Sequence, residues 1–575
     1  MRFSPLLLLA LFATPAVAAS PPETTIFGAN LASHMASRFH DLDAMVDYTK
    51  VALKQDPTNG MLAERLFSAD VLKGDLASAE GLAPLVIKAN SQQRTAQLVL
   101  GLKDFRDHRY ADARLHFNEA AYTPFGILTS TLLNAWSYAG ENSLNAALKE
   151  LDKLDSQPGF NNYKAFHTAL IADFMRSKMR ADAAYKSAYE LAPGSLRVVQ
   201  AYGNYLERQG HKDDAEKIYR AYLAADNGNI LIIKQLHDLA AAPKPQPFVA
   251  TPNAAAGEIL FSVASAMSSE ETSEASVTFA QLALPLTADH DFVLATLAGA
   301  QNNMKDIEAS SASYDQISKT SPLRDFADMQ IGVNQLILDH KPEAIDKLKQ
   351  LVLHSPNNID ANVTLGGAYR SNEQYTEAAD SYDKAIALMK GTEANGWRVY
   401  YDRGITYDHL KQYDKSEADF RKALELSKPD PKDDSQVLNY LGYSMIDRGV
   451  NLDEALGMVK KAVSLKPNDG YITDSLGWAY FVLKNYTDAT AYCERAVDLI
   501  PSDPTIAEHL GDVYWRGGRE LEARFQWQHA LDNHPDAADV PRISTKLKDG
   551  LAVEIVAKPA DASAPADPAK KPDNG

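Results

Sequence analysis

The feature that most constrains this fold is a unit of 34 residues that occurs twice, end to end, across residues 470–535. Each copy has a Leu-Gly pair, a tyrosine, two alanines around a bulkier residue, and a closing proline. These residues are Leu476, Gly477, Tyr480, Ala489, Cys493, Ala496 and Pro501 in the first copy, and Leu510, Gly511, Tyr514, Ala523, Trp527, Ala530 and Pro535 in the second. The Leu-Gly pair and the tyrosine share one face of a helix, and the alanines share one face of a second helix. Each unit is therefore predicted to be two helices that approach closely at the glycine.

The order and spacing of these residues resemble the tetratricopeptide repeat, a helix–turn–helix of about 34 residues. One helix pair cannot bury both of its faces, so successive units must stack on each other. The resemblance implies an all-α fold, a right-handed superhelix (α-solenoid) of helix–turn–helix repeats. It also implies a non-catalytic protein in which the first helix of each unit lines a concave surface that holds partner segments.

The same phase extends along most of the chain and predicts fourteen units. Six begin at residues 26, 60, 94, 128, 162 and 196, and eight begin at 256, 291, 325, 359, 397, 435, 470 and 504. Between the two sets, prolines at 243, 245, 247 and 252 cannot continue a helix. This segment is either an extended connector between two solenoid blocks or a long loop within one continuous superhelix.

The sequence thus predicts five segments after the N-terminus. They are a degenerate N-terminal solenoid at 26–240, a Pro/Ala-rich linker at 241–257, a C-terminal solenoid at 258–535, a capping helix at 536–551 and a disordered tail at 552–575.

Residues 1–19 predict a cleavable signal peptide. Arg2 precedes an apolar run at 6–13, then Pro15 and a series of small residues. An uncleaved anchor would need a longer apolar span, and no cysteine follows for lipid attachment. The mature chain is expected in the periplasm of a Gram-negative bacterium, where it is similar to long exported proteins with many such repeats.

Composition argues against other functions. The formal net charge is −18, from 76 acidic and 58 basic residues, which disfavours nucleic acid as a partner. No phosphate-binding loop, nucleophile elbow or zinc-protease helix occurs, and the 14 histidines are dispersed. No catalytic residue, metal or cofactor is therefore predicted. Cys493, the only cysteine, is expected to pack in the core.

The resemblance also implies which residues of the C-terminal units line the concave surface. They are Tyr401, Asp402, Asn439, Tyr440, Tyr443, Asp474, Trp478, Phe481, Asp512, Trp515 and Arg516. An aromatic surface with acidic edges suits a basic or neutral peptide better than a terminal carboxylate. The alternative for each aromatic residue is packing between neighbouring helices.

Two functions follow from this surface. The first is a protein interaction scaffold or adaptor in cell-envelope assembly, secretion or transport. The second is a module that binds an envelope polymer, peptidoglycan or polysaccharide, through stacked aromatic rings.

Overall fold

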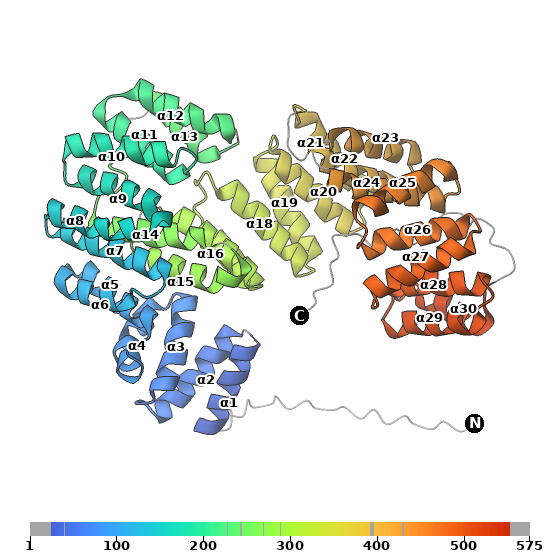
Figure 1. The fold of residues 1–575 in the computed structure, drawn as a ribbon, viewed down its shortest axis with the longest axis horizontal. Helices are drawn as coiled ribbons and strands as arrows, with labels where there is room; N and C mark the ends of the chain where they lie inside the picture. The colour runs from blue at the N-terminus through green and yellow to red at the C-terminus, as the bar shows by residue number, and fades with distance from the viewer. Residues whose placement is uncertain are drawn as a thin grey trace, which may run out of the picture. The chain divides into compact units, whose positions relative to one another are not determined.

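The computed structural model describes residues 25–39, 41–226, 228–241, 244–267, 269–287, 289–391, 396–427 and 431–551. These residues form thirty α-helices, three short 3-10 helices and no strand (Figure 1). The predicted all-α fold is confirmed. The predicted signal peptide and C-terminal tail lie outside the described residues.

The chain forms two compact units: unit 1, residues 1–334, and unit 2, residues 335–575. The helices that begin in unit 1 are α1 (Ile26–Arg38), α2 (Leu42–Gln55), α3 (Gly60–Lys73), α4 (Leu76–Ala89), α5 (Arg94–Arg106), α6 (Tyr110–Ala120), α7 (Pro124–Gly140), α8 (Leu144–Leu151), α9 (Asn161–Phe174), α10 (Lys178–Leu191), α11 (Leu196–Gln209), α12 (Lys212–Ala225), α13 (Ile230–Ala241), α14 (Pro252–Ala266), α15 (Ser273–Ala283), α16 (His290–Asn303), α17 (Ile307–Asp315) and α18 (Arg324–Ile337). The short 3-10 helices are η1 (Asp152–Ser156), η2 (Pro158–Phe160) and η3 (Glu270–Thr272).

Unit 2 contains the remaining helices. They are α19 (Lys341–His354), α20 (Ile359–Ser371), α21 (Tyr375–Leu388), α22 (Gly396–His409), α23 (Tyr413–Leu426), α24 (Pro431–Asp447), α25 (Leu452–Leu465), α26 (Gly470–Val482), α27 (Tyr486–Leu499), α28 (Pro504–Arg516), α29 (Glu520–Asp532) and α30 (Val540–Asp549).

The helices fall into fourteen consecutive pairs, with α13 and α30 single. Most pairs begin within a residue or two of the predicted phase. Helices α7, α14 and α24 begin about four residues earlier, each with a proline as its first residue. Proline fits that position because its fixed φ suits the helix and its missing N–H would have no intrahelical partner. In α7 the Thr123 hydroxyl caps the helix by accepting from the Gly126 amide at 3.0 Å.

The two helices of a pair are joined by a turn that uses one residue in the left-handed region. At 34-residue spacing these are Gly74, His108, Asn142, Arg176 and Gly210, and in the later pairs they include Lys305, Asp339, Glu373, Lys411, Lys484 and Gly518. The side chains have nothing in common, so the backbone conformation repeats without a sequence signature.

The predicted close approach at the glycines is present in both units. A methyl group built on Gly511 would lie 2.5 Å from the Trp527 ring, and one on Gly203 would lie 2.2 Å from the Tyr219 ring. In each case the aromatic residue comes sixteen positions later, on the second helix of the pair. The glycine is therefore required by the large side chain that crosses it.

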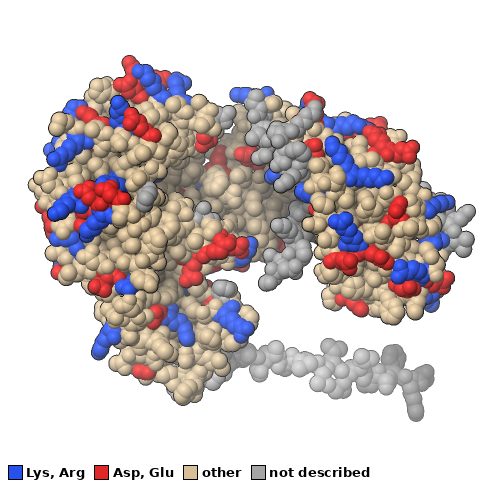
Figure 2. Space-filling view, viewed as in Figure 1, with Lys and Arg blue, Asp and Glu red and all other residues tan. Residues whose placement is uncertain are grey.

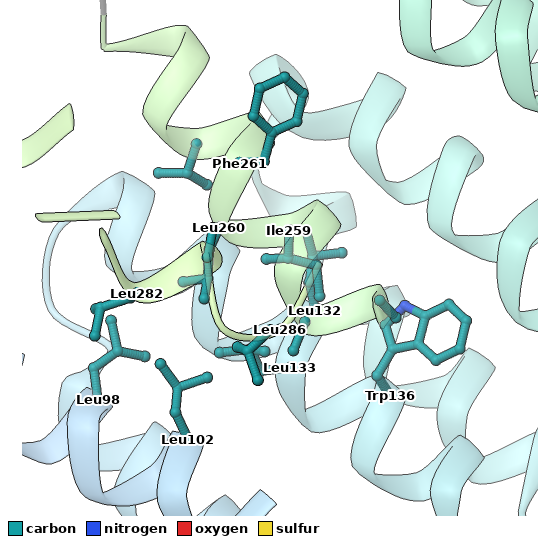
Figure 3. Packing of buried hydrophobic residues seen from close by; sticks show 14 of the residues in the cluster. Leu98, Leu102, Leu132, Leu133, Trp136, Ile259, Leu260, Phe261, Leu282 and Leu286 are labelled. Carbon is teal, nitrogen blue, oxygen red and sulfur yellow. The ribbon is translucent and has the colours of Figure 1, made fainter. Parts of the chain in front are cut away.

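Unit 1 folds back on itself after α13. Helix α14 packs against α7, and α15 packs against α3. Both contacted helices are first helices of their pairs, which form the inner face of the repeat stack. Leucines of α5 and α7 face Leu260, Leu282 and Leu286 across this contact (Figure 3). The inner face of unit 1 is thus covered by a later part of the same chain.

A buried arginine ties this covering segment to the stack. Arg197 of α11 donates from Nε to Glu258 of α14 at 3.0 Å, and its guanidinium lies 3.3 Å from Asp289. The same guanidinium lies 4.5 Å from the centroid of the Phe248 ring. A buried arginine is stable only when its charge is paired and its donors are used.

The proline-rich segment also lies against unit 1. Asn204 of α11 donates to the carbonyl of Gln246 at 2.9 Å, and the rings of Phe166 and Phe248 are 6.4 Å apart. Helix α14 begins at Pro252, inside the predicted linker, because Thr251 caps it. The division between the compact units comes after residue 334, downstream of the predicted linker at 241–257.

Unit 2 has a simpler arrangement. Among its described residues, each helix from α19 to α29 packs mainly against its immediate neighbours, and α30 packs against α29. Helix α30 lies within the predicted capping segment, 536–551. Its Ile543 is buried with Trp527 at the end of the stack.

Candidate functional site: the inner face of unit 2

The inner face of unit 2 carries two rows of side chains from successive first helices, α24, α26 and α28, and from α30. The first row, with steps of 35, 34 and 34 residues, is Asn439, Asp474, Glu508 and Arg542. The second row, with the same steps, is Tyr443, Trp478, Asp512 and Lys546. Since the two members on each helix are four residues apart, they lie on one helix face.

Helix α30 supplies the two cations of these rows. Arg542 pairs with Glu508, and Lys546 Nζ lies 2.6 Å from Glu508 Oε1 and 2.5 Å from Asp512 Oδ2. Asp512 also accepts from Trp527 Nε1 at 2.9 Å. Only 2% of Glu508 is exposed. The two buried carboxylates are thus compensated by the capping helix, as buried charges must be.

Asp474 has a different partner. Its Oδ2 lies 2.7 Å from His509 Nδ1, and both residues are buried. Trp478 stacks on the His509 ring at 4.2 Å and on Phe481 at 4.7 Å. Burial lowers the pKa of His509, but the charge and hydrogen bond of Asp474 outweigh it and raise that pKa above its usual value. Burial raises the pKa of Asp474, and His509 offsets this only in part.

Two acceptor atoms of the first row have no hydrogen-bond partner among the described residues. They are Oδ1 of Asp474 and Oδ1 of Asn439, both without solvent access. The buried Tyr443 hydroxyl belongs to the same cluster. Burial raises the pKa of Tyr443, the charges of Asp447 and Asp474 raise it further, and Arg542 opposes them. Tyr443 therefore keeps its proton.

Other predicted surface residues pack in the core. Tyr401 of α22 and Tyr440 of α24 lie 5.8 Å and 5.1 Å from the ring of Phe420 on α23, which lies between them in the chain. Trp515 packs on Trp527 at 5.4 Å, with the Arg524 guanidinium over its ring. Phe481 is buried under Trp478.

Two charged members of the predicted set lie apart from the cluster. Asp402 lies 3.5 Å from the Arg370 guanidinium, and Arg516 is half-buried. Asn439, Tyr443, Asp474, Trp478 and Asp512 are the predicted residues that share the two rows. Their role in binding stays a prediction.

Four residues of this site are absent from the predicted set: Glu508, His509, Arg542 and Lys546. The signal for Lys546 was available, because it follows Asp512 by one repeat length. The capping helix therefore continues the register of the repeats as well as covering the last pair. His509 follows Glu508 directly and gave no separate signal.

The described residues hold no group of three His, Cys, Asp or Glu side chains placed to bind a metal ion. Cys493 is buried, and burial raises the pKa of its thiol well above the usual value. Within the described ranges, no helix combines the length and the apolar character needed to cross a bilayer. Acidic and basic side chains are interspersed on the visible face of each unit (Figure 2).

Stacked helix pairs with an inner face of this kind define a helical-repeat scaffold. Three segments match family models described as tetratricopeptide repeat: residues 359–388, 397–428 and 448–504. All three lie in unit 2, where the repeat residues are most regular. This chain is therefore a tetratricopeptide repeat protein, and its repeats indicate a protein–protein interaction scaffold.

Curated relatives match only part of this chain. The BBSome complex member BBS4 of Bos taurus is 29% identical over 191 residues, which cover 32% of this chain and 34% of that protein. The TPR repeat-containing protein PA4667 of Pseudomonas aeruginosa is 25% identical over 183 residues, 31% of this chain and 30% of that protein. The chain thus spans about a third of the length of these relatives.

Solved structures of similar length match over most of the chain. A crystal structure of the APC/C hetero-tetramer Cut9-Hcn1 has 15% identity and a TM-score of 0.39, covering 91% of this chain and 96% of that chain. The crystal structure of yeast Tom70 has 12% identity and a TM-score of 0.31, covering 91% and 95%. None of the family models matched belongs to an enzyme family.

Proposed function

We propose that this protein is a non-catalytic scaffold of the bacterial periplasm that holds a partner protein segment on the inner face of unit 2. One observation carries the proposal. The two rows place the half-buried Asn439 and Trp478 beside the buried Tyr443, Asp474, Glu508 and Asp512 on α24, α26 and α28. Rigid aromatic rings beside polar groups are typical of surfaces that bind peptides.

The contrast with unit 1 supports the choice of face. The inner face of unit 1 is apolar and already covered by α14 and α15. A partner would have to displace a buried interface there. On unit 2 the half-buried Trp478 lies beside buried polar groups, and no helix equivalent to α14 packs on α24 or α26 among the described residues.

The periplasmic location is supported by the N-terminal sequence: Arg2, the apolar run and the small residues that follow. The test is expression of the full-length chain in a Gram-negative host, followed by fractionation and N-terminal sequencing. We expect the chain in the periplasmic fraction, beginning close to residue 20. A chain that keeps Met1, or that stays with the cytoplasm, contradicts the proposed location.

Partner binding is tested by site-specific photocrosslinking in cells. A photoreactive phenylalanine analogue replaces Trp478, which lies on the inner face and is half-buried. The matched control carries the same analogue in place of Lys461, which is exposed on α25, the outer helix of the preceding pair. We expect adducts of defined mass at 478 that are absent at 461, identified by mass spectrometry. Equal adducts at both positions, or none at 478, contradict the proposed function.

A further inference from the structure

We infer that two copies of this chain associate head to head through the first helix pair of unit 1, α1 and α2. The surface concerned, the open end of unit 1, consists of the exposed apolar side chains of this pair: Phe27, Leu31, Met35, Phe39, Tyr48 and Val51. The inference does not depend on the binding of a partner to unit 2. It is carried by the repeat register of these residues, by their exposed area, by the charge of α1, and by the contrast with the capped end of unit 2.

The second helix pair shows what the open end lacks. Ala69 of α3 and Leu82 of α4 belong to a hydrophobic cluster that they share with side chains of α1 and α2. The residues one repeat earlier, Met35 and Tyr48, are each 40% exposed, because no helix pair precedes them among the described residues. The first pair thus exposes apolar side chains at positions that the second pair packs against its neighbour. A repeat stack needs a polar or covered face at each end to stay soluble.

The exposed apolar area is large enough for a specific interface. Phe27 is 84% exposed and Leu31 is 64% exposed, and with Met35 they lie at intervals of four residues along α1. The side chains of the open end together expose roughly 600 Å², since one large side chain presents about 200 Å². Two copies would cover roughly 1,200 Å², and specific interfaces begin at about 1,000 Å².

The charge of α1 favours a second copy of an otherwise acidic chain. The net charge of the chain is −18, so two copies repel each other wherever acidic surfaces meet. Helix α1 contains no aspartate or glutamate, and Arg38 is its only lysine or arginine. Two α1 helices can therefore approach each other without bringing carboxylates together.

The last helix of unit 2 does not offer a matching surface. Beyond its first turn, the exposed residues of α30 are Ser544, Thr545, Lys548 and Asp549. A head-to-tail contact would place the apolar open end against these polar groups, and repetition of that contact would produce an open chain of molecules. A head-to-head contact joins two identical apolar surfaces about a two-fold axis and closes after two copies. The expected assembly is therefore a dimer.

The first test is sedimentation equilibrium of the chain without residues 1–19. We expect a reversible equilibrium between monomer and dimer with a Kd of about 1–100 µM, because an interface of this size gives a weak complex. A chain that stays monomeric at about 100 µM overturns the inference.

Variants at Leu31 locate the contact. Leu31→Lys should raise the Kd at least about tenfold, because it removes an apolar contact and brings two like charges together across the interface. Met179→Lys is the matched control, since Met179 is exposed on α10, outside the open end. That change should leave the Kd unchanged. Circular dichroism checks that each variant keeps its helical content, which is expected because both side chains are largely exposed.

Opposite charges at residue 31 test the head-to-head arrangement. Leu31→Glu alone should weaken the dimer as Leu31→Lys does, whereas an equimolar mixture of the two variants should associate again. Only a head-to-head contact brings residue 31 of one copy near residue 31 of the other. A mixture that stays monomeric overturns the inference. A Kd unchanged by Leu31→Lys, or raised equally by Met179→Lys, also overturns it.

A second measurement distinguishes a dimer from a chain that covers its own open end. Met35→Cys adds one accessible thiol, since Cys493 is buried. A flexible bis-maleimide should link two copies through this thiol, whereas Met179→Cys should give no linked dimer. A monomer whose new thiol does not react with maleimide would show that other residues of the same chain cover the open end, and this result overturns the inference. The crosslinking test at position 478 keeps its meaning under each of these outcomes.

Discussion

The two units use the same repeat but place different residues on their inner faces. In unit 1 the inner positions of α5 and α7 are Leu98, Leu102, Leu132 and Trp136, all buried under α14 and α15 (Figure 3). In unit 2 the equivalent positions of α24, α26 and α28 are Asn439, Tyr443, Asp474, Trp478, Glu508 and Asp512. An apolar inner face cannot remain in water and is covered by the chain itself. The polar inner face of unit 2 is the one that we propose as the place where a partner binds.

Two buried histidines show the same difference. His167 in unit 1 accepts from Trp136 Nε1 at 3.1 Å, and burial lowers its pKa to about 3. His509 in unit 2 faces Asp474, which raises its pKa despite burial. One histidine is neutral in the folded chain, and the other favours its charged form. The charge of the neighbouring side chain decides between these two states.

The largest effect on stability is expected from weakening the contact of α14 and α15 with the inner face of unit 1. Arg197→Ala leaves the buried Glu258 without its cation, and removing one partner of a buried ion pair costs about 3–5 kcal/mol. We expect calorimetry to show a lower melting temperature for unit 1 and an unchanged transition for unit 2. Arg220→Ala, which removes an exposed pair with Glu216, should cost less than about 1 kcal/mol. A loss of equal size in both variants would mean that Arg197 does not hold the cover.

Acid should weaken unit 1 through His167. Its folded pKa of about 3 lies below the usual 6.5, so the unfolded chain binds a proton first as pH falls. Between about pH 7 and pH 5 this lowers the free energy of unfolding of unit 1 by about 2 kcal/mol. The measurement is urea unfolding at several pH values for the original chain and His167→Gln. An identical pH slope in the two chains contradicts the assignment.

The glycine crossings should respond alike in both units, because they belong to the repeat itself. Gly203→Ala and Gly511→Ala each push a methyl group into an aromatic ring, so we expect each to cost about 1–3 kcal/mol. Gly457→Ala is the matched control, since a methyl group there meets no atom within 4 Å. That change should stabilise α25 by about 0.5–1 kcal/mol. A cost at one crossing alone would show that the units differ at this point too.

The smallest effect on stability is expected from the loss of the proton on His509 as pH rises. Its folded pKa is raised, so the stability that it contributes is present below about pH 6.5 and is lost as pH rises through the folded value. The melting temperature of unit 2 should fall as pH rises above about 7. His509→Gln should flatten this dependence, whereas His354→Gln, on the exposed end of α19, should not. A rise in melting temperature over this range would contradict the ion pair.

Much of the fold follows from the sequence because the crossing residues are fixed by shape. Gly511 and Trp527 set where two helices meet, and the alanines repeat the phase, so most helix starts are predictable. The turns are set by a left-handed backbone conformation that glycine, histidine, lysine and glutamate all adopt here. No residue pattern marks them.

The return of α14 and α15 onto unit 1 could not be predicted from repeat phase. That contact depends on pairs far apart in sequence, such as Arg197 with Glu258. The apolar residues at Leu98, Leu102 and Leu132 indicated a face that needs cover, but did not say which segment covers it. Similarly, Tyr401 and Tyr440 fall at inner positions by count, yet their rings turn inward to Phe420. Whether these rings are buried depends on the direction of their side chains, which the repeat spacing alone does not give.

Helix α30 has a consequence for any shortened version of this protein. A fragment that stops after the last helix pair, near residue 535, would lose Arg542 and Lys546 and leave Glu508 and Asp512 without their cations. Such a fragment would still contain every helix of the repeat, but its end would carry two uncompensated negative charges. The fragment would attract basic molecules at a position where the intact protein does not. Affinities for basic molecules measured on the fragment would therefore reflect the truncation and not the native surface.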